Sequence, residues 1–146
     1  MSATFAELAS LEGRVALVVG GGGHIGGRIA EALAELGANV VVADIDGARS
    51  AEVARRIAEQ HDVSAEHLVV DLEDSEATRS LPGQVESSFG RLDVLVHSAA
   101  LVGTSPLPGW NVPLADQSVE TWRRALEVNL TSAFVVCQAA APLLAQ

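Results

Sequence analysis

The chain has 146 residues, 49% of them hydrophobic but only 3% aromatic, so we expect one domain with a core of small aliphatic side chains. Its formal net charge of −10 argues against nucleic acid and anionic membrane surfaces as partners, because both require a basic surface. The single cysteine, Cys137, cannot form an internal disulfide, which favours a reducing compartment such as the cytoplasm.

Neither a secretory signal nor a membrane-spanning segment is expected. Residues 1–13 are acidic and lack a basic stretch followed by an apolar one. The longest apolar runs, such as residues 15–19, have the length of a strand, whereas a helix that crosses a bilayer needs roughly 20 residues. The sequence therefore predicts a soluble cytoplasmic protein.

In the first half of the chain, apolar runs of strand length alternate with segments of helical period, which is typical of a parallel sheet covered by helices. Strands are predicted over residues 14–19, 39–43, 67–70 and 92–97. Helices are predicted over residues 24–36, ended by Gly37, and over residues 47–61. The apolar face of the first helix is expected to consist of Ile25, Ile29, Ala32, Leu33 and Leu36.

The later segments are less regular. Residues 75–89 predict a helix whose regular part begins near Pro82, because Pro82 and Gly83 interrupt the pattern. Residues 98–117 are rich in proline and too long for an ordinary connection, so we expect a functional loop. Residues 118–146 predict one long helix, with Ser118 as its N-cap and Thr121 as the less favoured alternative; Pro142 should limit its end.

Together these elements predict an α/β fold of the Rossmann type, a doubly wound parallel sheet with strands in the order 3-2-1-4. Residues 1–146 would form a single dinucleotide-binding domain that is incomplete at its C-terminus. In such sheets ligands bind beyond the carboxyl ends of the strands, where the strand order reverses. That rule places the turn after residue 19 and the segment after residue 97 around one crevice.

The turn from Gly20 to Gly26 joins a predicted strand to a predicted helix. Glycines there let a pyrophosphate approach bare backbone, and the N–H groups at the helix N-terminus favour an anion. Asp44 ends the second strand, where dinucleotide-binding folds place an acid that accepts hydrogen bonds from the ribose hydroxyls. An acid there repels a 2′-phosphate and favours NAD over NADP. Alternatively, the glycines form only a tight turn, and Asp44 is only a turn or helix-cap residue.

These residues resemble the short-chain dehydrogenase/reductase family over nearly the whole chain. Its Thr-Gly-x-x-x-Gly-x-Gly motif is matched at Gly20 and Gly26, while Val19 and His24 depart from it. The alternative spacing Gly-x-x-Gly-x-x-Gly, found in the epimerase-like branch, fits Gly20, Gly23 and Gly26. The resemblance assigns the cofactor-binding turn to Gly20, Gly23, His24, Ile25 and Gly26.

Two further segments resemble the family. Asp71 and Leu72 look like the pair that holds the adenine ring, although Asp71 could instead be a helix-entry acid. Residues 97–100 resemble the Asn-Asn-Ala-Gly motif, with Ala99 identical and with Ser98 and Ala100 able to supply the same backbone contacts to a cofactor. His97 departs from the motif, and at a strand end we expect a hydrogen-bonded structural histidine rather than a base or ligand.

Residues 126–130 resemble the family's Asn-Val-Asn signature, whose second Asn interrupts the helix and supports a proton relay. This makes Asn129 the candidate catalytic residue. Its alternative is a tolerated polar residue on a long helix. The histidines lack metal-ligand spacing, and no metal is expected.

The resemblance implies hydride transfer between NAD(H) and a small alcohol or carbonyl substrate. The family's chemistry uses a Ser, a Tyr and a Lys that would follow a fifth strand, and this chain ends before them and contains no Tyr and no Lys. We therefore expect a truncated oxidoreductase that is inactive alone. A non-catalytic dinucleotide-binding or regulatory module, or an epimerase- or dehydratase-like relative acting on a nucleotide sugar, are the alternatives.

Truncation would leave the fourth strand at an edge of the sheet and the apolar final helix short of partners. In the family this helix commonly builds a subunit interface, so the resemblance implies a homo-oligomer through the C-terminal helix.

Overall fold

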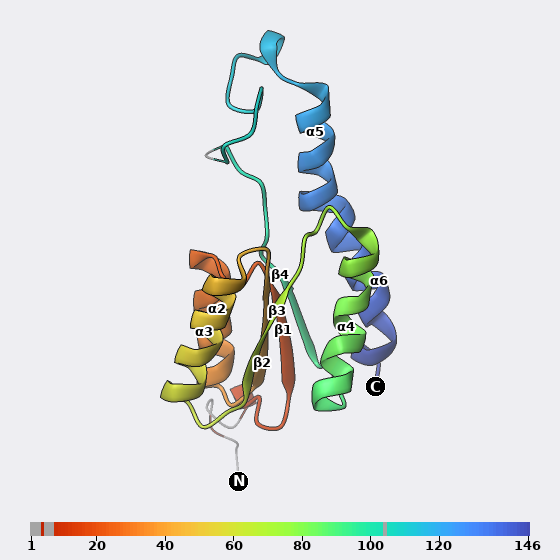
Figure 1. The fold of residues 1–146 in the computed structure, drawn as a ribbon. Helices are drawn as coiled ribbons and strands as arrows, with labels where there is room; N and C mark the ends of the chain where they lie inside the picture. Colours follow the sequence, from red (N-terminus) through yellow and green to blue (C-terminus); the bar gives the residue numbers. More distant parts are fainter. Residues whose placement is uncertain (1–3, 5–7, 104) are drawn as a thin grey trace.

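The computed structural model describes residues 4, 8–103 and 105–146. The prediction that the N-terminal segment holds no secretory signal falls partly outside these residues. Four parallel strands form one sheet in the order β3-β2-β1-β4, which confirms the predicted topology (Figure 1). The strands are β1 (Val15–Val19), β2 (Asn39–Asp44), β3 (Ala65–Val69) and β4 (Val94–His97).

Helices cover both faces of the sheet. Figure 1 shows α2 (His24–Glu35) and α3 (Gly47–Gln60) on one side, with α4 (Ser75–Phe89) and α6 (Ser132–Leu144) on the other. Every residue of β1 is buried, because the central strand is covered on both faces. The core is built from Val, Leu, Ile and Ala side chains, as the composition predicted.

The two edge strands differ from the predicted ranges. β3 begins at Ala65, which pairs with Val40, and it ends at Val69. β4 begins at Val94 rather than at residue 92, and just before it Asp93 donates its N–H to the carbonyl of Val15 and accepts the N–H of Val15 at its carboxylate. All four residues of β4 are only partly buried, and β4 is paired on one side only, to β1.

The predicted apolar face of the first helix is only partly right: Leu33 packs against the core and Ile29 is partly buried, but the other three residues are exposed. Helix α2 turns its small residues to the sheet, burying Gly26, Gly27, Ala30 and Ala34. Ile25 is 74% exposed and Leu36, just past the helix, is 41% exposed. Small side chains let the helix axis approach the sheet closely, and this packing outweighs the burial of larger apolar residues that point sideways.

Helix α4 spans the predicted residues 75–89, but the expectation that its regular part begins near Pro82 is wrong, since the helix is regular from Ser75 with Pro82 inside it. Asp74 caps the start by accepting hydrogen bonds from the N–H groups of Glu76 and Ala77. Leu81, Pro82 and Val85 are buried. The cap and the burial of this face outweigh the hydrogen bond that proline cannot donate.

The last helical region is continuous but irregular. Helix α5 (Val119–Leu126) leads into a π-helical turn, η2 (Glu127–Thr131), and then into α6. Ser118 is the N-cap, as predicted, and accepts the N–H of Thr121. The loop that follows β4 contains a 3-10 turn, η1 (Leu114–Asp116), and projects with α5 beyond the carboxyl ends of the strands (Figure 1).

One helix of the described chain is long and apolar enough to cross a membrane by length and composition, namely Val119–Leu144 with a mean hydropathy of 1.3. Core helices of proteins that cross no membrane meet the same two criteria. Here α6 buries Val135, Val136 and Ala140 beneath it. The expectation of no membrane partner stays a prediction.

Candidate functional site

A cavity of about 330 Å³ opens at the carboxyl ends of β1, β2 and β4, where the strand order reverses. Most of the predicted cofactor-binding residues line it together, although they come from four separate segments of the chain. These residues are Gly20, Gly23, Asp44, Asp71, Leu72, Ser98, Ala99 and Ala100. The sheet topology therefore brings them to one place.

The floor of the cavity is bare backbone. Gly20 has a φ of +81°, and a Cβ atom added there would lie 2.4 Å from the amide nitrogen of Ala99. A Cβ at Gly26 would lie 2.2 Å from the carbonyl oxygen of Gly20. These two glycines allow the turn, the start of α2 and the end of β4 to pack against one another without side chains. Gly26 thus supports the cavity from below and does not line it.

The N-terminus of α2 begins directly after this turn. Gly23 is its N-cap, no side chain caps it, and its first turn contains no acidic residue. The first N–H groups of a helix have no partner within the helix, so this end favours an anion. His24 and Ile25 are exposed and lie outside the cavity lining, so any contact that they make with a ligand would be at its rim.

The carboxylate of Asp44 is held in place by backbone groups. Oδ2 accepts the N–H of Gly22 at 2.9 Å, and Oδ1 accepts the N–H of Asp46 at 3.0 Å. A Cβ at Gly22 would approach the Asp44 carboxyl carbon to 2.9 Å, so a side chain there would push the acid aside. Each oxygen keeps capacity for a further hydrogen bond, and the residue lines the cavity.

The segment after β3 forms another wall. Leu72 is buried, and the exposed Asp71 accepts the N–H of Glu73 at 2.9 Å. Glu73 also forms an ion pair with Arg124 of α5, and the hydrogen bond from Arg124 lowers the pKa of Glu73. Both partners line the cavity.

Sequence reasoning missed several residues that line this cavity, namely Val19, Ile45, Val70, Glu73, Leu101, Arg124 and Val128. Ile45 and Glu73 follow predicted site residues directly, and this adjacency could have indicated them. Arg124 and Val128 are four residues apart and so share one helix face. This spacing identifies them as lining residues only when the other residues that line the cavity are already known.

At the end of β4, the N–H of Ser98 donates to the carbonyl of Val19 and so extends the pairing with β1 by one residue. The neighbouring His97 is half-buried, and its Nε2 lies 2.9 Å from Oγ of Ser132, which donates to the carbonyl of Val128 at 2.6 Å. Burial lowers the pKa of His97. These contacts agree with the structural role that was expected for this histidine.

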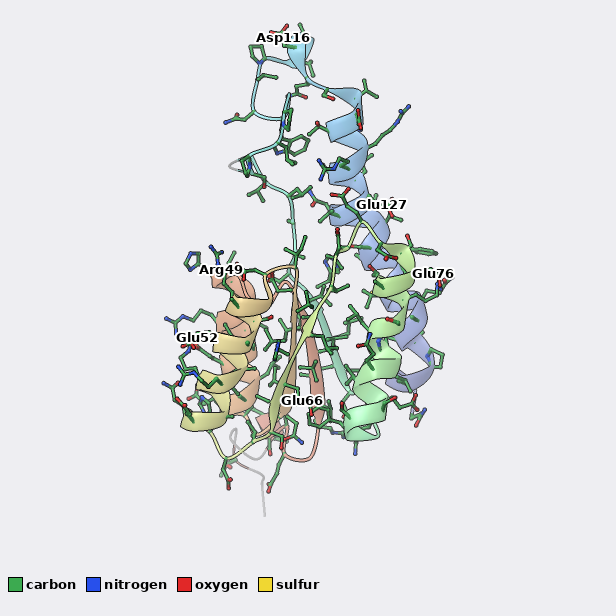
Figure 2. All side chains as sticks on the ribbon, viewed as in Figure 1. Arg49, Glu52, Glu66, Glu76, Asp116 and Glu127 are labelled. Atoms are coloured by element: carbon green, nitrogen blue, oxygen red, sulfur yellow. The ribbon has the colours of Figure 1, made fainter. Side chains whose placement is uncertain are left out.

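Asn129 lies in the π-helical turn, so the helix is interrupted where the motif predicts. Its side chain accepts the N–H of Leu101 at 2.7 Å and donates to the carbonyl of Leu101 at 2.9 Å. Asn129 itself is outside the cavity lining, but Leu101 and Val128 belong to it. The neighbouring Glu127, labelled in Figure 2, accepts a hydrogen bond from Ser75 at 3.3 Å.

The part of the chain that the structure describes contains no group of three or more His, Cys, Asp or Glu side chains able to hold a metal ion.

The family model described as "short chain dehydrogenase" matches residues 14–146. The chain belongs to this family. It is 36% identical over 135 residues to a 3-oxoacyl-[acyl-carrier-protein] reductase of rhamnolipid biosynthesis from Pseudomonas aeruginosa, covering 92% of this chain and 49% of that reductase.

Solved structures agree with this assignment. The chain matches the RhlG protein of Pseudomonas aeruginosa, in an active-site complex with NADP, with a TM-score of 0.80 and 32% identity over 93% of this chain and 50% of that one. It matches a short-chain type dehydrogenase/reductase from Mycobacterium marinum with a TM-score of 0.85 and 28% identity over 97% and 54%. The chain spans about half the length of these three relatives.

Proposed function

We propose that the cavity binds a nicotinamide dinucleotide, and that the chain serves as the cofactor-binding half of an oxidoreductase. The observation that carries this proposal is the convergence on one cavity of a side-chain-free turn, an uncapped helix N-terminus and the fixed carboxylate of Asp44. The turn and helix would hold the pyrophosphate, Asp44 the adenosine ribose, and Asp71 with Leu72 the adenine.

The proposed cofactor is NAD rather than NADP. Asp44 is fixed by the N–H groups of Gly22 and Asp46, so it cannot easily turn away from a ligand. A 2′-phosphate bound beside this carboxylate would meet a like charge at close range. The Pseudomonas aeruginosa relative was solved with NADP, so the preference is a proposal about this chain's own Asp44 and not about the family.

The bound nicotinamide would accept or donate a hydride, with a small alcohol or carbonyl compound as the second substrate. This chain would bind and orient the dinucleotide, and Asn129 would support the wall beside it through Leu101. The family's proton-transfer residues are a Tyr and a Lys, and the sequence contains neither. We therefore propose that this chain alone binds the dinucleotide without transferring hydride.

A second candidate function is a dinucleotide-binding module that acts without hydride transfer, because the residues that line the cavity support binding by themselves. One experiment separates binding from catalysis. The isolated chain is mixed with NAD+ and a panel of alcohols, and both binding and NADH formation are recorded. Binding without NADH formation is expected. Sustained NADH formation by this chain alone would contradict the proposal, and absence of binding would remove both candidates.

We further propose that the chain self-associates through its C-terminal helical region and acts in the cytoplasm. Support for self-association comes from five exposed apolar side chains spaced three or four residues apart along one helical path: Val119, Trp122, Leu126, Leu130 and Phe134. The unpaired Cys137 is exposed and fits a reducing compartment.

A further inference from the structure

Glu73 and Arg124 form an ion pair, and both residues line the cavity. Glu73 follows Leu72 on the segment after β3, whereas Arg124 lies on α5, the helix that projects from the body of the molecule (Figure 1). Nε of Arg124 lies 3.1 and 3.0 Å from the two carboxylate oxygens of Glu73, and Nη2 lies 2.6 Å from Oε1. Two nitrogens of the guanidinium are therefore held, which fixes its plane as well as its position.

The charges around the cavity make this arginine distinctive. Asp44, Asp71 and Glu73 contribute three acidic side chains to the lining, and among the described lining residues only Arg124 is cationic. Its side chain is 44% exposed although Glu73 holds the guanidinium, so part of the side chain remains accessible to a ligand. Glu73 raises the pKa of Arg124, and the guanidinium stays charged.

Arg124 shares the cavity lining with apolar side chains that suit an aromatic ring. Val128 lies one helical turn further along and also lines the cavity, and Leu72 gives a buried apolar surface beside Glu73. A flat, charged guanidinium stacks well on an aromatic ring, and adenine is the large aromatic part of the proposed ligand. A lysine could not provide such a plane.

We propose that the guanidinium of Arg124, held by Glu73, forms the wall against which the adenine ring stacks. Arg124 is thus a ligand-contacting residue, and Glu73 is the positioning residue that orients it. This inference rests on the proposed dinucleotide function and adds a named contact to the adenine ring.

The test uses ADP, which carries adenine, ribose and pyrophosphate but no nicotinamide. Its affinity, and the affinities of NAD+ and NADP+, are measured by calorimetry for the unmodified chain, Arg124→Ala and Arg124→Lys. Both variants should bind ADP and NAD+ about three- to thirtyfold more weakly, the range expected for a lost guanidinium–ring contact. Arg123→Ala is the matched control, because Arg123 is the adjacent exposed arginine of α5 and does not line the cavity; its affinity should be unchanged.

A second readout is independent of affinity. The Nε–H resonance of Arg124, assigned by its loss in Arg124→Ala, should shift when ADP saturates the chain. Glu73→Gln should shift the same resonance in the free chain and weaken ADP binding less than Arg124→Ala does. Far-ultraviolet circular dichroism of each variant verifies that it is folded.

Three results would overturn the inference: ADP affinity that is unchanged in Arg124→Ala, affinity that is restored by Arg124→Lys, or a loss confined to NADP+. The second would mean that charge alone matters, and the third that Arg124 serves a phosphate. If the unmodified chain binds neither ADP nor NAD+, the proposed function itself fails. If it binds both and Arg124→Ala binds equally well, only the adenine contact is refuted.

Discussion

Both polar groups of the Asn129 side chain are bonded to the backbone of Leu101, the amide oxygen to its N–H and the amide nitrogen to its carbonyl. The bonds join the π-helical turn to the segment that leaves β4, two parts of the chain that border the same cavity through Val128 and Leu101. The residue that the motif marks as catalytic therefore holds the site together in this structure. Its oxygen retains capacity to accept one more hydrogen bond.

Replacing Asn129 with Ala should loosen the wall of the cavity. We expect the free energy of unfolding to fall by about 1–2 kcal/mol, because two hydrogen bonds are lost at an exposed position. Hydrogen exchange at the Leu101 amide should become faster. Asn111→Ala, at an exposed residue of the neighbouring loop, is the control. Unchanged exchange at the Leu101 amide in Asn129→Ala would show that the two hydrogen bonds between Asn129 and Leu101 do not form in solution.

Gly20→Ala should destabilise the chain and abolish dinucleotide binding. The position has a φ of +81°, and the added Cβ would collide with the backbone of Ala99. A positive φ alone costs about 1–2 kcal/mol for a non-glycine residue, and the collision adds to this cost. Gly83→Ala is the matched control: it lies in α4 with open space around it and should be neutral or stabilising by up to about 1 kcal/mol. Thermal unfolding of both variants measures the difference, and equal melting temperatures would contradict the close packing of Gly20 on Ala99.

Asp93 makes the stability depend on pH at the acidic end. Hydrogen bonds from Arg91, assisted by Arg14 and the N–H of Val15, hold the pKa of Asp93 well below its usual range. A lowered folded-state pKa means that the contribution is complete above the unfolded value near 4 and is lost progressively as the pH falls further.

Asp93→Asn should therefore be less stable than the unmodified chain at pH 7, by roughly 1–3 kcal/mol, and this difference should shrink at pH 3. Urea unfolding at the two pH values provides the measurement. Asp116→Asn is the control, because Asp116 lies at the tip of the projecting loop (Figure 2). A stability difference that is the same at both pH values would contradict the ionic role of Asp93.

Self-association should depend on the exposed apolar side chains of the last helical region. Phe134 is 64% exposed on α6, and Phe134→Glu should shift the chain toward the monomer in sedimentation experiments. Leu114→Glu is the control: Leu114 is 85% exposed but lies on the projecting loop. A monomeric unmodified chain, or an equal effect of both substitutions, would contradict the proposed interface.

Local patterns were enough to predict the sheet and the convergence of most candidate site residues on one cavity. Continuous apolar runs predict buried parallel strands, and short connections leave one natural strand order, which the structure confirms. Gly20, Asp44 and Asp71 then come to the same edge of the sheet, because each lies at or just after the carboxyl end of a parallel strand.

The predictions that the structure corrects depend on tertiary packing, which a single sequence does not reveal. The periodicity of α2 includes Ile25, but the helix buries Gly26, Gly27, Ala30 and Ala34 and leaves Ile25 exposed. Pro82 reads as a helix breaker, yet the cap at Asp74 and the buried face keep α4 intact. Arg124 reads as a solvent-exposed charge, because its partner Glu73 is 51 residues away.

The most direct test of dinucleotide binding is calorimetric titration of the unmodified chain and of Asp44→Ala with NAD+ and with NADP+. The unmodified chain should bind NAD+ more tightly than NADP+. Asp44→Ala should weaken NAD+ binding and reduce the difference in affinity between NAD+ and NADP+. The substitution removes both the acceptor for the ribose hydroxyls and the charge that repels a 2′-phosphate. Failure of a folded, unmodified chain to bind either dinucleotide would contradict the proposed function, and tighter binding of NADP+ would contradict the role given to Asp44.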